Sequence, residues 1–172
     1  MVEVSTRQAL PRDLEPIARL YDHYIVHTPI TFDLEARGIE GQQGWFDGFA
    51  ATGPHQLYVA EDETGVLGYA ASQPLRPKAA YATSVETSIY IEPSRHRQGL
   101  GRRLYATLFD ALAREDVHRA YAAITLPNPN SVALHERFGF YAVGTMSEVG
   151  RKQGRYWDVG WFEKALSGDA DR

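Results

Sequence analysis

A short glycine-containing loop is the first segment of this chain whose residues could do chemistry. It reads Gln98-Gly99-Leu100-Gly101, with Arg95 and Arg97 before it and Arg102 and Arg103 after it. Where a strand passes into a helix, the first helical N–H groups lack partners, and glycines let an anion approach the backbone closely. The arginines add positive charge that suits a diphosphate. An alternative stays open: the loop could be no more than the start of a helix with arginines on its surface, because an isolated glycine pair is a weak signal.

Two nucleotide-binding patterns do not fit the loop. The Rossmann dinucleotide motif needs a small residue where Leu104 stands, and no Gly-Lys-Ser or Gly-Lys-Thr sequence exists for a P-loop. The sequence therefore disfavours NAD and ATP as the ligand.

The loop must be positioned by a strand before it and a helix after it. Residues 84–91 alternate in the manner of a strand, with one face formed by Val85, Thr87, Ile89 and Ile91, and the other by Glu86, Ser88 and Tyr90. Beyond the loop, apolar residues recur every three or four positions and predict a helix that begins near Gly101: Leu100, Leu104, Leu108, Ala111 and Leu112.

The segments before this strand, loop and helix predict a further helix and a hairpin. Asp13 is expected to cap a helix over 14–25, a weaker helical segment surrounds 45–49, and 31–44 has the composition of a loop. Two β-favouring runs, 56–61 and 66–72, flank a turn and predict an antiparallel pair.

The segments after the unit complete an α/β sandwich with a mixed sheet. A strand over 120–126 leads into a turn whose last residue, Asn130, is expected to cap a helix over 131–138. Gly139 is a suitable stop for that helix. A closing hairpin is predicted from strands at 142–148 and 156–164, with a turn at 150–154.

The whole chain limits the classes of function. Its 172 residues, 44% of them apolar, suit one domain over 1–166 with a polar tail at 167–172. The net charge of −4 argues against a nucleic-acid partner, and the absence of cysteine excludes disulfides and thiolate metal sites. No segment approaches the roughly 18 apolar residues of a membrane span, so we expect a cytoplasmic protein without a membrane partner. His23 and His27 lack a third metal ligand nearby, so no metal is expected.

The glycine loop, its preceding strand and the segment from Asn128-Pro-Asn-Ser131 through Gly139-Phe140 together resemble the GNAT family of acetyl-CoA-dependent N-acetyltransferases. The resemblance covers almost the whole chain and implies the GNAT fold, a mixed central sheet flanked by helices. It also implies that the sheet splays beside strand 84–91, and that acetyl-CoA contacts Ile89, Tyr90, Ile91, Arg97, Gln98, Gly99, Leu100, Gly101, Arg102, Asn128 and Ser131. One departure is His96, because the family usually has Gln or Arg at the start of its loop motif.

Five further segments resemble phosphinothricin and methionine sulfoximine N-acetyltransferases within that family. They are His23-Tyr-Ile, Thr28-Pro-Ile-Thr31-Phe32-Asp33, Arg76-Pro-Lys78-Ala-Ala-Tyr81, Val85-Glu86-Thr-Ser88-Ile-Tyr90 and Trp157-Asp158-Val159-Gly160. This resemblance implies direct acetyl transfer, in a ternary complex, to the α-amine of a small amino acid or analogue, and a homodimer. Two alternatives stay open: an acetyltransferase for a different amine, and a non-catalytic coenzyme A-binding regulator.

Two residues are candidates for proton transfer. An ammonium must lose a proton before it attacks a thioester, and Glu86 could accept that proton as general base or could merely orient the ammonium. His135 stands where many family members have a tyrosine, so it could protonate or hydrogen-bond the leaving thiolate. A packed histidine is the alternative.

The acceptor's acidic end and side chain need other residues. Arg76 and Lys78 could bind an anionic group, although Lys78 replaces a second arginine and loses the planar fork. Phe32, Tyr81 and Trp157 could form a side-chain pocket or be ordinary core residues. We interpret Lys152, in the predicted closing turn, as a solvated charge.

Overall fold

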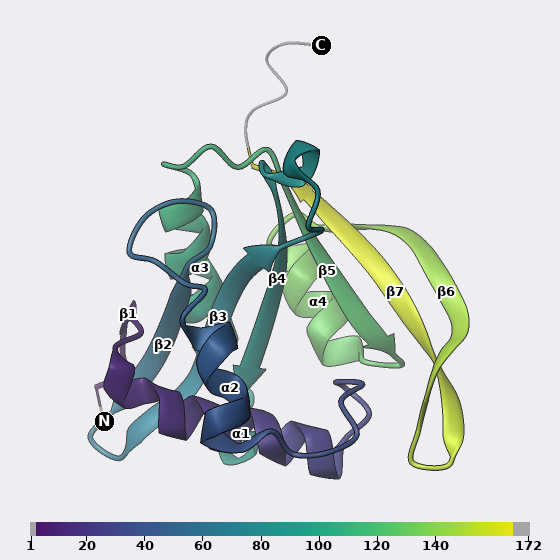
Figure 1. The fold of residues 1–172 in the computed structure, drawn as a ribbon, viewed down its shortest axis with the longest axis horizontal. Helices are drawn as coiled ribbons and strands as arrows, with labels where there is room; N and C mark the ends of the chain where they lie inside the picture. The colour runs from purple at the N-terminus through teal and green to yellow at the C-terminus, as the bar shows by residue number, and fades with distance from the viewer. Residues whose placement is uncertain (1–2, 167–172) are drawn as a thin grey trace.

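The computed structural model describes residues 3–166, which form a seven-stranded sheet with helices on both faces (Figure 1). The strand order is β1-β2-β3-β4-β5-β7-β6. Strands β4 and β5 pair in parallel and the other neighbours are antiparallel. This confirms the predicted mixed sheet. No helix among these residues has both the length and the apolar composition to cross a membrane. The predicted polar tail, 167–172, lies outside the described residues.

The first half of the chain contributes one edge of the sheet and the helices of one face. Its elements are β1 (Ser5–Gln8), η1 (Pro11–Asp13), α1 (Leu14–His27), α2 (Gly38–Phe46), β2 (Leu57–Asp62), β3 (Gly65–Pro74), η2 (Ala79–Tyr81) and β4 (Ser84–Ile91). Strand β4 has the predicted bounds, and β2 and β3 form the predicted antiparallel pair.

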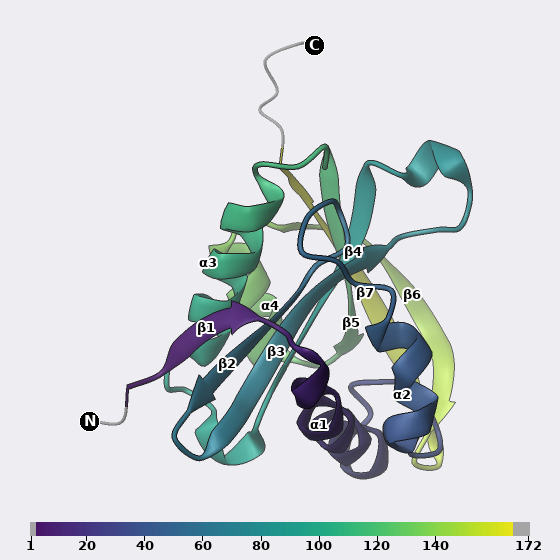
Figure 2. The ribbon, with the colours of Figure 1, turned by 60° about the vertical axis from the view of Figure 1, so that its left-hand side comes forward.

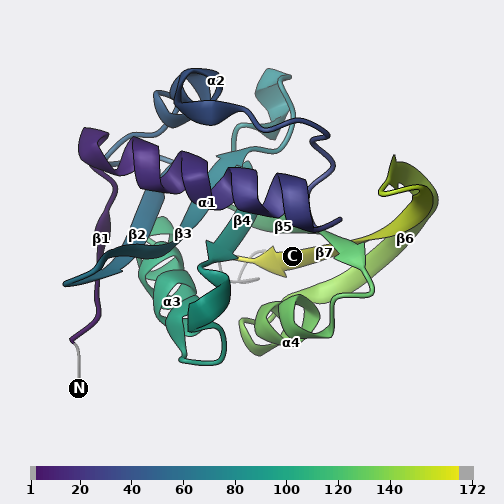
Figure 3. The same ribbon diagram turned by 90° about the horizontal axis from the view of Figure 1, so that it is seen from below.

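The second half contributes the other edge and the opposite face. Its elements are η3 (Pro93–Arg95), α3 (Leu100–Leu112), β5 (Arg119–Leu126), α4 (Pro129–Arg137), β6 (Tyr141–Lys152) and β7 (Arg155–Ala165). Seen from below, α1 and α2 lie on one side of the strands, and α3 and α4 on the other (Figure 3).

Each face of the sheet has its own apolar core. Helix α1 buries Ile17, Leu20 and Tyr24 against the β2 and β3 residues Leu57, Val59, Tyr69 and Ala71. Helix α3 packs the predicted stripe against the other face, with Ala111 only partly buried, and it also buries two residues outside the stripe, Tyr105 and Phe109. Figure 2 shows α3 and α1 on opposite sides of the same strands. The two cores thus pack against the two faces of the sheet.

The sheet opens between β4 and β5. Their register runs only from Ser84 opposite Arg119 to Glu86 opposite Tyr121. Strand β4 continues to Ile91 while β5 turns away and pairs with β7 as far as Leu126, so the two strands diverge (Figure 1). This is the splay that the family resemblance implies, and it leaves one edge of β4 without a neighbouring strand.

Three boundaries differ from the sequence predictions near the N-terminus. Strand β1 was not predicted, because Ser-Thr-Arg-Gln is short and polar. Asp13 does not cap α1 with its side chain; its carboxylate accepts hydrogen bonds from Arg7 and from the Leu10 N–H. Arg7 also binds Glu61 on β2, so this ion-pair group joins β1, β2 and the start of α1. Helix α2 begins at Gly38, inside the segment predicted as loop.

Two boundaries differ in the second half. The cap of α4 is Asn128, not Asn130: its side-chain oxygen accepts from the Ser131 N–H at 3.2 Å. The closing turn is shorter than predicted, because β6 runs to Lys152 and only Gln153 and Gly154 separate it from β7. Both residues have positive φ, 52° and 77°, as a tight two-residue hairpin turn requires.

Candidate active site

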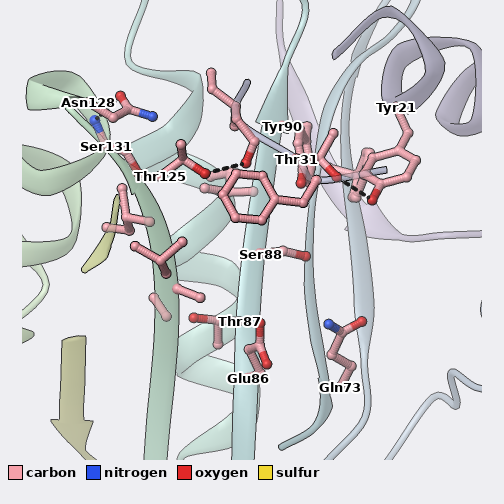
Figure 4. A pocket seen from close by; sticks show the side chains of 18 of the residues that line it. Tyr21, Thr31, Gln73, Glu86, Thr87, Ser88, Tyr90, Thr125, Asn128 and Ser131 are labelled. Carbon is pink, nitrogen blue, oxygen red and sulfur yellow. Dashed lines mark hydrogen bonds between the residues drawn. The ribbon is translucent and has the colours of Figure 1, made fainter. Parts of the chain in front are cut away.

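A pocket of about 440 Å³ occupies the gap between β4 and β5. Its floor is formed by β4 and β5, one wall by β3 and the segment after α1, and the other by the start of α4 (Figure 4). The predicted residues that line it are Phe32, Glu86, Ile89, Tyr90, Asn128, Ser131 and His135. The structure therefore brings the predicted proton-transfer residues and part of the predicted acetyl-CoA set to one cavity.

Glu86 is the last residue of β4 that pairs with β5, and its carboxylate lines the pocket. Burial raises the pKa of this carboxyl above its usual range, and the positive charge of Arg76 opposes that rise. No hydrogen bond from another described residue reaches the carboxylate. The group is therefore placed to exchange a proton with a molecule in the pocket.

His135 lies on α4 at the pocket wall, and only 3% of its surface is exposed. Its Nδ1–H donates to the Ser131 carbonyl at 2.7 Å, so Nε2 accepts from the Tyr105 hydroxyl at 2.8 Å. Burial lowers the pKa of the imidazole, although the bond to Ser131 opposes this. Burial therefore favours the uncharged ring, and both nitrogens have partners within the α3–α4 contact.

The glycine loop lies at the start of α3, as predicted. Gly99 has φ +78°, and a Cβ built there would meet no atom within 4 Å, so its outer side is open. The N–H groups of Leu100, Gly101 and Arg102 occupy the first helical turn, where no carbonyl of the helix can accept them. The Leu100 side chain is buried, which leaves only its backbone for a ligand. These features fit the diphosphate of acetyl-CoA.

Gly101 has a second role. A Cβ at this position would lie 3.0 Å from Cδ2 of Leu134, so the missing side chain allows α3 to approach α4.

The charged residues around the loop divide into two groups. Arg95 pairs with Asp62 at 3.2 Å, and Arg103 donates to the Val4 carbonyl at 2.9 Å, so both are used within the fold. Arg97 and Arg102 make no hydrogen bond or ion pair with another described residue. These two arginines, which the sequence suggested, are therefore available to an anion.

His96 faces the protein rather than the anion site. Its Nε2 lies 3.0 Å from the Tyr24 hydroxyl, and that hydroxyl donates to the Ile91 carbonyl at 2.7 Å. His96 therefore joins the glycine loop to α1, which accounts for its departure from the family pattern without a phosphate contact.

Three residues predicted to bind the acceptor lie away from the pocket lining: Arg76, Lys78 and Tyr81. The Arg76 guanidinium donates to the Leu75 carbonyl and lies 5.5 Å from the centre of the Trp161 ring. Lys78 and Tyr81 are exposed in the connection between β3 and β4. Of these three, only Arg76 acts on the site, through its charge.

Lys152 is buried, not solvated as its sequence context suggested. Its Nζ donates to the Thr31 carbonyl at 2.7 Å, and only 6% of the residue is exposed. The Phe32 ring packs onto Gly150, so closely that any side chain at 150 would collide with it. The tip of the β6–β7 hairpin thus holds the segment after α1 against the pocket.

The polar and aromatic pocket residues missed from the sequence include Tyr21, Arg37, Trp45 and Gln73. Arg37 is paired with Asp33, and Tyr21 donates to the same carboxylate. Trp45 donates to the Gln73 side chain. Gln73 lies one residue past the predicted strand 66–72, and the alternation of that strand is the signal that could have placed it on the face of Glu86.

Within residues 3–166, no group of three or more His, Cys, Asp or Glu side chains is arranged so that it could hold a metal ion. His23 and His27 stack with ring centres 4.6 Å apart.

A mixed sheet that splays at its centre, with an open glycine loop at the start of the next helix, defines an acetyl-CoA-dependent N-acetyltransferase. The chain belongs to the GNAT family: the family model described as an acetyltransferase (GNAT) domain matches residues 7–161.

Comparison with individual proteins narrows the class. The chain is 53% identical over 166 residues to the phosphinothricin N-acetyltransferase of Streptomyces coelicolor, covering 95% of this chain and 97% of that protein. It is 32% identical to the L-methionine sulfoximine/L-methionine sulfone acetyltransferase of Pseudomonas aeruginosa, covering 96% of each. A phosphinothricin acetyltransferase from Sinorhizobium meliloti, solved with acetyl-CoA, superposes with a TM-score of 0.91 at 29% identity, covering 98% of this chain and 92% of that one.

Proposed function

We propose that this N-acetyltransferase acts on the α-amine of a small amino acid or amino-acid analogue of the methionine sulfoximine or phosphinothricin type. The observation that carries the proposal is the Glu86 carboxylate, which accepts no hydrogen bond from another described residue and lines the pocket at the point where β4 and β5 separate. The pocket volume suits a small acceptor. The names of the relatives support an acceptor of this type.

In the proposed reaction the acceptor binds as an ammonium beside Glu86, which takes one proton directly or through a water molecule. Acetyl-CoA supplies the thioester carbonyl: the C–N bond forms, the C–S bond breaks with its electron pair leaving on sulfur, and the second proton lost by the nitrogen goes to that sulfur to give the free thiol. The N–H groups at 100–102, with Arg97 and Arg102, hold the diphosphate. The open edge of β4 at Ile89, Tyr90 and Ile91 is proposed to pair with the pantetheine arm, and Asn128 and Ser131 to flank it. Holding the two reactants in line supplies much of the acceleration.

The sequence left two roles open for His135, a partner of the leaving thiolate or a packed histidine, and its geometry favours the second. Its Nδ1 is bonded to the Ser131 carbonyl and its Nε2 to the Tyr105 hydroxyl, so neither ring nitrogen is left to donate a proton to a thiolate. We therefore propose that His135 fixes α4, and with it Asn128 and Ser131, against Tyr105 of α3.

We further propose a homodimer in the cytoplasm. Strand β6 is the edge of the sheet and carries exposed apolar side chains along its length: Tyr141, Val143, Met146 and Val149. Such a band is typical of a protein interface. The use of acetyl-CoA, which is made inside cells, supports the location.

A thiol-release assay tests the proposed acceptor. The protein is incubated with acetyl-CoA and L-methionine sulfoximine, phosphinothricin, the standard amino acids or a polyamine. Release with one or more amino acids and none with the polyamine is expected. Thiol release with the polyamine alone would show that the protein acetylates a different class of amine. No release with any amine would favour a coenzyme A-binding regulator.

Replacement of the proposed base tests its role. Glu86→Gln should lower kcat by about 100-fold, the usual scale of general-base assistance, with little change in acetyl-CoA affinity. Glu92→Gln is the matched control, because Glu92 follows the same strand but does not line the pocket. Unchanged turnover in Glu86→Gln would remove Glu86 from the base role.

A further inference from the structure

Gln73 on β3 lies directly beside Glu86 on the neighbouring strand β4. The antiparallel register of β3 and β4 pairs these two residues, and both line the pocket. Directly opposed residues on neighbouring strands have Cβ atoms about 5 Å apart and project from the same face. Figure 4 shows the two side chains side by side at one end of the cavity. A molecule whose amine reaches Glu86 therefore also reaches Gln73.

A hydrogen bond from Trp45 fixes the orientation of the Gln73 amide. The indole Nε1–H of Trp45, on α2, lies 3.0 Å from Oε1 of Gln73. Because an indole nitrogen only donates, the atom that it contacts must be the amide oxygen, and the NH₂ group must point the other way. In Figure 4 the Gln73 nitrogen lies on the side of Glu86. Trp45 is itself held by Phe49 and Tyr69, whose ring centres lie 4.7 Å and 5.7 Å away.

The NH₂ group therefore presents two donors to the cavity. No other described residue accepts a hydrogen bond from it. A donor left unpaired in a filled, water-poor site costs free energy, so a ligand that offers an oxygen there gains over one that does not. The basic residues predicted for this task, Arg76 and Lys78, do not line the pocket.

We propose that Gln73 is a specificity-determining residue: its NH₂ group donates to an oxygen of the acceptor while Glu86 faces the acceptor's amine. The acceptor class is an amine with an oxygen a few bonds away, which is either the α-carboxylate or a side-chain oxygen. Trp45 is the positioning residue that keeps the amide in this orientation. The inference rests on the proposed function and adds to it the group that recognises the acceptor.

Steady-state kinetics of Gln73→Leu test the inference. The KM for the best amino-acid acceptor should rise by about 10-fold, the effect of one lost hydrogen bond, while the KM for acetyl-CoA stays within twofold. Trp45→Phe keeps an aromatic ring but removes the indole donor, so it should raise the acceptor KM in the same direction. Gln43→Leu, on the exposed side of α2, is the control and should change neither constant.

Three related acceptors distinguish the two sources of the oxygen. L-Methionine sulfone adds side-chain oxygens to L-methionine, and 3-(methylsulfanyl)propylamine is L-methionine without its carboxylate. If Gln73 binds a side-chain oxygen, Gln73→Leu should abolish the preference for the sulfone over methionine. If it binds the carboxylate, the variant should reduce the preference for methionine over this amine.

The inference is overturned if Gln73→Leu, with its acetyl-CoA affinity retained, keeps the wild-type KM for all three acceptors. This result differs from failure of the proposed function, which would appear as absence of thiol release by the wild-type protein with every amino acid. Equal acceptor KM values for Trp45→Phe and wild type, beside a raised value for Gln73→Leu, would overturn the positioning role of Trp45 alone.

Discussion

At the scale of single residues, two opposed effects act on the carboxyl group of the proposed base, Glu86. Burial of Glu86 in the pocket raises its pKa, because the charged form is poorly solvated there, and the positive charge of Arg76 lowers it. A base must be deprotonated to act, so activity is lost as the pH falls through this pKa. If Glu86 is the base, Arg76 extends the pH range of activity toward lower pH without lining the pocket.

Arg76→Gln should move the acid limb of the pH profile of kcat/KM to higher pH. Without the arginine, burial acts on Glu86 unopposed and the pKa of the carboxyl rises further. The measurement is kcat/KM for the acceptor against pH with acetyl-CoA saturating. Lys78→Gln is the control, since no effect of Lys78 on Glu86 is found. A limb that stays in place, or that moves equally in both variants, would contradict this explanation.

The sequence predicts which residues could do the chemistry better than it predicts where their side chains lie. Glu86 could be placed because strand alternation fixes which face it occupies. Arg76 could not, because it lies in the connection between β3 and β4, where no periodicity constrains a side chain. Lys152 was misjudged for a similar reason: its partner, the Thr31 carbonyl, is 121 positions away in the chain.

At the scale of elements, two contacts between secondary structures set the shape of the site. The first is the approach of α3 to α4 at Gly101 and Leu134. Gly101→Val should lower the free energy of unfolding by about 1–3 kcal/mol, the usual cost of overpacking. Leu134→Ala should recover part of that loss when combined with it, because it makes room for the new side chain.

Thermal unfolding of wild type, both single variants and the double variant measures this coupling. Additive losses in the double variant would show that the two positions do not compete for the same space. The contact places the glycine loop, at the start of α3, beside Asn128 and Ser131, at the start of α4, which are the residues proposed to hold acetyl-CoA.

The second contact joins the β6–β7 hairpin to the segment after α1. Lys152→Met removes the donor to Thr31 and frees the segment that carries Phe32 into the pocket. The KM for the acceptor should therefore rise about 10-fold, with the KM for acetyl-CoA little changed. Arg151→Met, on the adjacent exposed residue, should change neither. An effect of Lys152→Met on acetyl-CoA alone would show that the hairpin serves the other half of the site.

The elements that could be predicted are those with strong local signals. Strand β4 and helix α3 follow from their apolar periodicity. Helix α2 could not be predicted well, because Gly38, Gly41 and Gly44 give it low helical propensity and the packing of Trp45 supports it instead. The cap of α4 was misplaced by two residues, since Asn128 and Asn130 are equally suitable by type and only the fold decides between them.

At the scale of the whole molecule, the exposed edge of the sheet bears on assembly. Light scattering after size-exclusion chromatography should give about twice the chain mass of 19.3 kDa. Replacing Val143 and Met146 by Glu should shift the mass toward that of one chain, because a charge in an apolar interface is costly. Val26→Glu, an equally exposed apolar position on α1, is the control. A wild-type mass of one chain would contradict the proposed homodimer.

The parting of β4 and β5 also has a mechanical consequence. The sheet consists of two wings, β1–β4 and β5–β7, joined by the short register that ends at Glu86 and Tyr121. Glu86 therefore sits at the apex of a wedge, and Ser88 and Tyr90 lie progressively nearer its mouth. In a wedge that opens or closes, displacement grows with distance from the apex. The proposed base is thus at the point of the cavity that moves least when the wings adjust to the molecule between them.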